Sequence, residues 1–199
     1  MFHARMIIML RSLLSTSLLF CLAVTASAEP SANLQSAAEI GLSDGTAAPE
    51  IAAFTSDGAP ASLASITGEN GTVLVFFRSA DWCPFCKKQL VDLESAVAPL
   101  KAAGWSLAAI SYDSAETLSE FKERSNLSYT LISDEDSSVI RDFSLLNEGS
   151  KEGSRFYGIP HPAIVFIGKD GRIKETLSEE GYKDRPPAEL VISTAQGLN

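Results

Sequence analysis

Two cysteines three residues apart, Cys83 and Cys86, are the residues of this sequence best suited to chemistry. They stand in the run Trp82-Cys83-Pro84-Phe85-Cys86, between an apolar stretch and a segment of helical periodicity. Residues three apart share one face of a helical turn, so the two sulfurs can reach disulfide geometry. Pro84 suits the first helical position, which puts Cys83 at the helix N-terminus. Free N–H groups and the helix dipole favour a thiolate there, so the run predicts redox chemistry by a nucleophilic and a resolving cysteine.

Three other uses of this cysteine pair are alternatives. A structural disulfide over so short a loop would remove little entropy from the unfolded chain. A structural zinc site normally has four ligands, and His161 is the only other soft ligand after the first 28 residues. A copper carrier built from Cys83, Cys86 and His161 has a suitable ligand set. The alternative for His161 is that it is an ordinary turn residue before a proline and binds no metal.

The first 28 residues have the three-part pattern of a secretory signal peptide. Arg5 and Arg11 supply the positive start, residues 13–24 form an uncharged and mostly apolar run, and Ala26-Ser27-Ala28 fits a cleavage site before Glu29. The run is about 12 residues, shorter than the roughly 20 that a membrane-spanning helix needs. We therefore expect an exported protein, periplasmic or secreted, without a membrane span in the mature chain.

The whole sequence has the composition of one soluble domain. Of its 199 residues, 45% are hydrophobic and 21% are charged, with 13 Gly and 9 Pro, which excludes collagen-like, disordered and multi-span membrane classes. The formal net charge of −9 argues against nucleic acid as a partner. Residues 29–44 are predicted to form a flexible leader, and residues 45–199 a single folded domain.

The patterning along that domain predicts an α/β fold with a mixed central sheet flanked by helices. Helix 84–103 has apolar residues on one face and stops at Gly104, and Asp113 with Glu116 predicts a capping box for the next helix. The Asp170-Gly171 turn predicts an antiparallel hairpin. The expected strands are 73–77, 105–112, 129–132, 163–167 and 173–177, and the other expected helices are 113–124, 139–143 and 187–196.

A second segment supports redox chemistry. Gly158-Ile159-Pro160-His161-Pro162 directly precedes the apolar run 163–167. Prolines cannot continue a strand ladder, so they mark its beginning. A cis peptide bond is plausible at either X-Pro bond, above all at His161–Pro162.

With these segments together, the chain resembles the thioredoxin-fold redoxins, most closely the alkyl hydroperoxide reductase/thiol-specific antioxidant (AhpC/TSA) group. The resemblance covers roughly residues 45–197. It implies a thioredoxin-like fold with the cysteine motif at the start of the first long helix, and it makes Pro162 the candidate cis-proline opposite that motif. The matching pieces are Gly45-Thr46-Ala47-Ala48-Pro49, Phe54, Asp57-Gly58, Phe76-Phe77-Arg78, Trp82 to Cys86, Gly158 to Ala163, and Lys169-Asp170-Gly171-Arg172-Ile173.

The sequence departs from the peroxiredoxin pattern at two positions. The peroxidatic position of the family falls on Cys86, and Cys83 stands where those proteins usually carry Thr or Ser. Their usual arginine would fall near Pro162, and Arg78 and Arg155 are the candidates to replace it. The central strand 73–77 also lacks the buried acid often found in thioredoxins.

Three functions follow from these observations. The first is an exported thiol–disulfide oxidoreductase in which Cys83 attacks and Cys86 resolves, with Trp82, Pro84 and Pro162 in supporting roles. The alternative is a peroxiredoxin-like peroxidase with an antioxidant role, and the third is the copper carrier. The first two need a disulfide or hydroperoxide substrate and a thiol electron-donor protein, and neither needs a cofactor.

Overall fold

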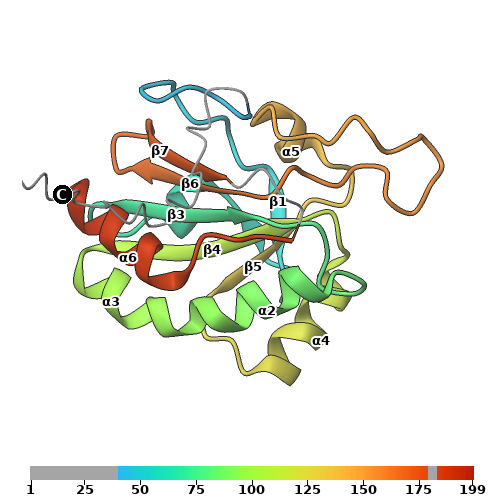
Figure 1. Cartoon of the computed structure of the whole chain (residues 1–199), viewed down its shortest axis with the longest axis horizontal. Helices are drawn as coiled ribbons and strands as arrows, with labels where there is room; N and C mark the ends of the chain where they lie inside the picture. The colour runs from blue at the N-terminus through green and yellow to red at the C-terminus, as the bar shows by residue number, and fades with distance from the viewer. Residues whose placement is uncertain (1–39, 179–182) are drawn as a thin grey trace, which may run out of the picture. The chain divides into compact units, whose positions relative to one another are not determined.

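The structure, a computed structural model, describes residues 40–178 and 183–199 as one α/β unit (Figure 1). The predicted signal peptide and residues 29–39 lie outside the described residues. In chain order the elements are β1 (Ala53–Thr55), β2 (Pro60–Ala61), α1 (Leu63–Ile66), β3 (Gly71–Phe76), α2 (Pro84–Asp92), the 3-10 turn η2 (Leu93–Ala96), α3 (Val97–Ala102), β4 (Trp105–Ser111), α4 (Ala115–Ser125), β5 (Thr130–Ser133), α5 (Ser138–Asp142), β6 (Ala163–Gly168), β7 (Ile173–Ser178) and α6 (Ala188–Gly197).

The strands form one mixed sheet in the order β2-β1-β5-β4-β3-β6-β7. The inner strands β3, β4 and β5 are parallel, as the alternation of strands and helices predicts. Strand β6 runs antiparallel to β3, and β7 returns antiparallel to β6 through the predicted Asp170-Gly171 turn. The predicted mixed α/β sheet is thus confirmed.

Helices cover both faces of this sheet (Figure 1). Every residue of β3 is buried, because its alternate side chains enter two different cores. Val73 and Val75 join the core under α2, α3, α4 and α6, whereas Leu74 and Phe76 join the core under α1 and α5. Ile40, within the predicted leader, packs against the second core. In the part of the chain that the structure describes, no helix has the length and apolar character to cross a membrane.

The predicted long helix 84–103 is three consecutive pieces. Helix α2 ends at Asp92, η2 tightens the next four residues, and α3 resumes at Val97. Leu90, Leu93 and Leu100 still face one core, so the apolar stripe is as predicted although the helix is not continuous. Gly104 follows with φ +80°, a backbone conformation that glycine adopts without strain, and it ends the helical run as expected.

The predicted capping box at Asp113 is wrong. Ser114 is the N-cap of α4, and its hydroxyl accepts a hydrogen bond from the Thr117 N–H. The Asp113 carboxylate instead turns inward and binds the segment before the cysteines. The N-terminal hairpin of β1 and β2 and the short helix α1 were absent from the expected elements, since two or three residues carry too little periodicity to predict.

Candidate active site

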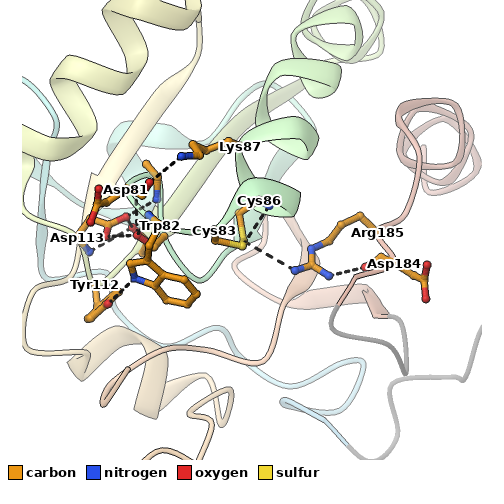
Figure 2. The surroundings of a disulfide bond; sticks show 12 residues. Asp81, Trp82, Cys83, Cys86, Lys87, Tyr112, Asp113, Asp184 and Arg185 are labelled. Atoms are coloured by element: carbon orange, nitrogen blue, oxygen red, sulfur yellow. Dashed lines mark hydrogen bonds between the residues drawn. A yellow bond between two sulfur atoms is a disulfide. The ribbon is translucent and has the colours of Figure 1, made fainter. Parts of the chain in front are cut away.

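The two cysteines lie at the start of α2, directly after the loop that leaves β3. Cys83 is the N-cap, with an extended backbone, and Pro84 is the first helical residue. A disulfide joins Cys83 to Cys86, whose Cα atoms are 5.3 Å apart (Figure 2). The helical start therefore brings the sulfurs together, as the spacing predicts.

The two sulfurs have different neighbours. The backbone N–H of Cys86 donates to Cys83 Sγ at 3.2 Å, as expected for a helix N-cap. Cys86 Sγ accepts from Arg185 Nη2 at 3.8 Å, and Figure 2 shows this guanidinium reaching toward the disulfide from the other end of the chain. Cys83 is 4% exposed and Cys86 is 0% exposed, so water screens neither sulfur well. One cysteine thus has a neutral donor and the other a cation.

Asp113 holds the loop that leads to Cys83. Its carboxylate accepts hydrogen bonds from the Ala80 N–H at 2.7 Å, the Ser79 hydroxyl at 2.8 Å and the Ser111 hydroxyl at 2.9 Å. Burial raises the pKa of Asp113, although these three donors oppose the shift. The buried carboxylate ties the end of β4 to the residues between β3 and α2.

Trp82 connects the cysteine loop to the segment before β6. Its indole N–H donates to the Tyr112 hydroxyl at 2.9 Å (Figure 2). That hydroxyl donates in turn to the Arg155 carbonyl at 2.7 Å. The Phe156 ring packs edge-on against Trp82 with centroids 4.8 Å apart, and the Arg155 guanidinium lies 5.8 Å from the Trp82 centroid. Residues 155–156 therefore cover the residue next to Cys83.

The predicted proline segment lies at the end of the sheet where β3 leads into the cysteine loop. Ala163 of β6 pairs with Phe76, the last residue of β3, so Pro162 stands beside the start of the cysteine loop. The His161 N–H donates to the Leu145 carbonyl at 2.6 Å, and burial together with nearby Arg78 lowers the pKa of its imidazole. Within residues 40–178 and 183–199, no three His, Cys, Asp or Glu side chains are grouped to hold a metal ion. The copper-carrier hypothesis therefore has no ligand group in this part of the chain.

A groove of about 280 Å³ runs between α2 and the segment before α6. Phe85 and Gln89 line it from α2, and Arg185 lines it from the opposite side. Gln89 is buried, and its Oε1 has no hydrogen-bond partner within the described residues. The groove thus offers an apolar wall and the Gln89 Oε1 acceptor beside Arg185, which contacts Cys86.

Of the predicted site residues, Cys83, Cys86, Trp82 and Pro84 lie together at the start of α2 with Pro162 directly before the neighbouring strand β6, whereas Arg185 and Asp113 were not predicted at the site. Arg185 is 99 residues from Cys86 along the chain, so no local spacing connects them. Two arginines were expected near the cysteines. Arg155 lies over the Trp82 ring, and the charge of Arg78 lowers the pKa of His161. The Ser111-x-Asp113 pattern at the end of a buried strand was a usable signal for Asp113.

Comparison with known proteins identifies the domain. The model of the AhpC/TSA family matches residues 45–176. Peroxiredoxin Bcp of Escherichia coli is 34% identical over 138 residues, which cover 69% of this chain and 86% of that protein. The crystal structure of peroxidoxin BcpB from Mycobacterium tuberculosis matches with a TM-score of 0.65 at 19% identity, over 80% of this chain and 96% of that one. Peroxiredoxin Q of Xanthomonas campestris matches with a TM-score of 0.62 at 20% identity, over 74% and 90%. The structural matches confirm the expected redoxin fold.

Proposed function

The chain belongs to the AhpC/TSA family, and we propose that it is a thiol peroxidase that reduces hydroperoxides through Cys83 and Cys86. It is an enzyme of the peroxiredoxin type, as its relatives are. The observation that carries the proposal is the bonded cysteine pair at the start of α2, inside the segment that the family model matches. A pair in this position can close and reopen its disulfide within one helical turn.

The proposed reaction has three balanced steps. A cysteine thiolate attacks the terminal oxygen of the hydroperoxide, the O–O bond breaks, and the alkoxide takes a proton and leaves as an alcohol or, for hydrogen peroxide, as water. The attacking sulfur becomes a sulfenic acid. The second cysteine then displaces its hydroxyl as water and forms the disulfide, and a donor dithiol reduces the disulfide by thiol–disulfide exchange while becoming oxidised itself.

The peroxidase replaces thiol–disulfide exchange as the leading function. Exchange was the first expectation from the Trp-Cys-Pro-Phe-Cys run, but the matched relatives are named peroxiredoxins, which favours the alternative. Exchange is retained here as the regeneration step, in which the donor protein is the partner. The buried Cys83–Cys86 bond makes a small or flexible attacking group necessary for that step.

The site of action is also a proposal. The signal-like residues 1–28 support export, with cleavage before Glu29 and reduction of peroxides outside the cytoplasm. Mass spectrometry of the protein recovered from the periplasm or medium of an expressing bacterium tests this. A mature chain that starts at Glu29 supports export, whereas a full-length chain retained in the cytoplasm refutes it.

Rapid-mixing fluorescence of the reduced protein with a hydroperoxide tests the function. Trp82 adjoins Cys83, so formation of the disulfide should change its emission. We expect oxidation far faster than that of free cysteine at the same pH, and no change in a protein in which both cysteines are serine. Slow oxidation by peroxide with fast oxidation by a small disulfide would refute the peroxidase and support exchange.

A further inference from the structure

The position of Arg185 is the feature of the site that most needs an explanation. It precedes α6, yet its guanidinium reaches across to the start of α2 and contacts Cys86 Sγ at 3.8 Å (Figure 2). We propose that Arg185 is a catalytic residue that holds Cys86 as the attacking thiolate and leaves Cys83 as the resolving cysteine. This assignment rests on the proposed peroxidase function, and it reverses the roles of the two cysteines only with respect to the thiol–disulfide exchange hypothesis, in which Cys83 attacks.

The two sulfurs differ in the charge that lies beside them. Cys83 Sγ accepts from a neutral amide, whereas Cys86 Sγ lies against a guanidinium that stays protonated at any physiological pH. An opposite charge within about 4–6 Å of an acid lowers its pKa by about 1–3. Cys86 is completely buried, so solvent weakens this attraction little. When the disulfide is reduced, the thiolate should therefore form first on Cys86.

The helix N-terminus does not reverse this preference. Cys83 is the N-cap and Cys86 the third helical residue, so both lie in the first turn, where the dipole favours a negative charge. Two neighbouring cations on α2 are engaged elsewhere: Lys87 donates to the Asp81 carbonyl, and Lys88 pairs with Asp92. The further charged side chains that line the groove are Lys183 and Asp184. Arg185 is thus a cation in direct contact with Cys86 Sγ.

The fold holds Arg185 in place. Pro186 and Pro187 follow it directly and stiffen the backbone. Helix α6 then buries Ala188, Val191 and Ala195 in the core beneath α2 and α3. A guanidinium anchored by a packed helix needs little reorganisation when charge develops, which is the condition for effective electrostatic stabilisation.

The groove offers the hydroperoxide a binding place beside Arg185, the residue that contacts Cys86 Sγ. Arg185 forms one wall of the groove, and Phe85 and Gln89 form the facing wall, whereas the buried Cys86 does not itself line it. The buried Gln89 Oε1, which has no hydrogen-bond partner in the described parts of the chain, can accept from the hydroperoxide O–H. Arg185 can donate to the peroxide oxygens and to the departing alkoxide.

The steps then follow in one order. Cys86 thiolate attacks the terminal peroxide oxygen, the O–O bond breaks, and the alkoxide leaves with a proton from solvent. Cys83 attacks the sulfur of the resulting Cys86 sulfenic acid, the S–O bond breaks, and the hydroxyl leaves as water with the Cys83 proton. Arg185 keeps its own proton throughout and acts by charge.

Thiol titration of single-cysteine variants tests the assignment without peroxide. Cys83→Ser combined with Cys21→Ser leaves Cys86 as the single cysteine, and its thiolate absorbance is followed against pH with and without Arg185→Met. We expect Arg185→Met to raise the Cys86 pKa by about 1–3, and Arg185→Lys to raise it less. Arg141→Met is the matched control, since it removes a cation from α5 on the opposite face of the sheet, and it should leave the Cys86 pKa unchanged. A Cys86 pKa unaffected by Arg185→Met in folded protein overturns the proposal.

Sulfenic-acid trapping then tests the order of the cysteines. A hydroperoxide together with a sulfenic-acid reagent should label Cys86 in the Cys83→Ser protein much faster than Cys83 in the Cys86→Ser protein. The opposite order overturns the assignment. If neither cysteine is labelled while Arg185 still lowers the Cys86 pKa, the peroxidase function fails but the electrostatic role of Arg185 stands.

Discussion

Replacing Asp113 with alanine should destabilise the fold and slow the cysteine chemistry together. The carboxylate is buried and accepts hydrogen bonds from one backbone amide and two hydroxyls. The hydroxyls of Ser79 and Ser111 can rotate toward other acceptors, but the Ala80 N–H is fixed by the backbone. The alanine variant therefore leaves this amide buried without an acceptor.

The expected loss follows from these contacts. A buried donor left unsatisfied costs about 1–3 kcal/mol, and loss of the two hydroxyl bonds adds to this cost. Relief from burying a charge offsets part of it, because burial already raises the pKa of Asp113. We expect the free energy of unfolding to fall by about 2 kcal/mol. If all of this loss appears as poorer positioning of the cysteine loop, peroxide-driven oxidation slows by at most roughly 30-fold.

Asp134→Ala is the matched control. Asp134 is also a buried carboxylate with three donors, the Val139 and Ile140 N–H groups and the Ser138 hydroxyl, but it holds the first turn of α5 instead of the cysteine loop. Urea unfolding of the oxidised proteins should show a loss for Asp134→Ala at least as large as that for Asp113→Ala, since two backbone amides lose their acceptor, and rapid-mixing oxidation should slow only for Asp113→Ala. Equal slowing in both variants, or a loss of stability below about 0.5 kcal/mol for Asp113→Ala, would refute this reasoning.

Three further predictions concern the surroundings of the site. Tyr112→Phe removes the hydroxyl that links Trp82 to the Arg155 carbonyl. Because the segment around Arg155 then opens more often, trypsin should cleave the folded protein faster after Arg155, and an unchanged cleavage rate would contradict the link. Tyr129→Phe removes a buried 2.7 Å hydrogen bond to a carbonyl of α2 and should lower the free energy of unfolding by about 1 kcal/mol in urea, whereas an unchanged midpoint would show that the bond contributes nothing. Burial raises the pKa of Asp113 above 3.8, so the pH-dependent part of its contribution to stability is fully present below that pH and is lost as the pH rises through its folded-state pKa. The stability of wild type relative to Asp113→Asn should therefore fall as the pH rises above 3.8, and a rise would contradict the shift.

The elements that carry strong local patterns were predictable. The continuous apolar runs at β3 and β6 indicate strands buried on both faces, and both are central in the sheet. The leucine stripe on α2 and α3 and the stop at Gly104 appear as expected. These features depend on periodicity and backbone preference, which neighbouring residues determine.

The mispredicted helix cap depends on competition with distant groups. Asp113 has the position of a helix cap, but the Ala80 N–H and the Ser79 hydroxyl offer it buried donors from another segment, and Ser114 takes the cap. Local propensity is a weak preference that tertiary contacts of this kind override. The interruption at η2, by contrast, has a local cause: Pro99 cannot donate to the Ser95 carbonyl and its ring crowds that carbonyl, which disfavours a continuous α-helix over residues 93–96.

The sequence by itself determined the reactive pair. Three-residue spacing and Pro84 at a helix start bring Cys83 and Cys86 together, because one helical turn suffices to do so. Only the tertiary structure decided which charges meet each sulfur. Arg185 reaches Cys86 because α6 packs against α3 and η2, and the electrostatic difference between the cysteines arises from that long-range contact. Coulomb attraction depends on separation in space, which the order of residues along the chain does not reveal.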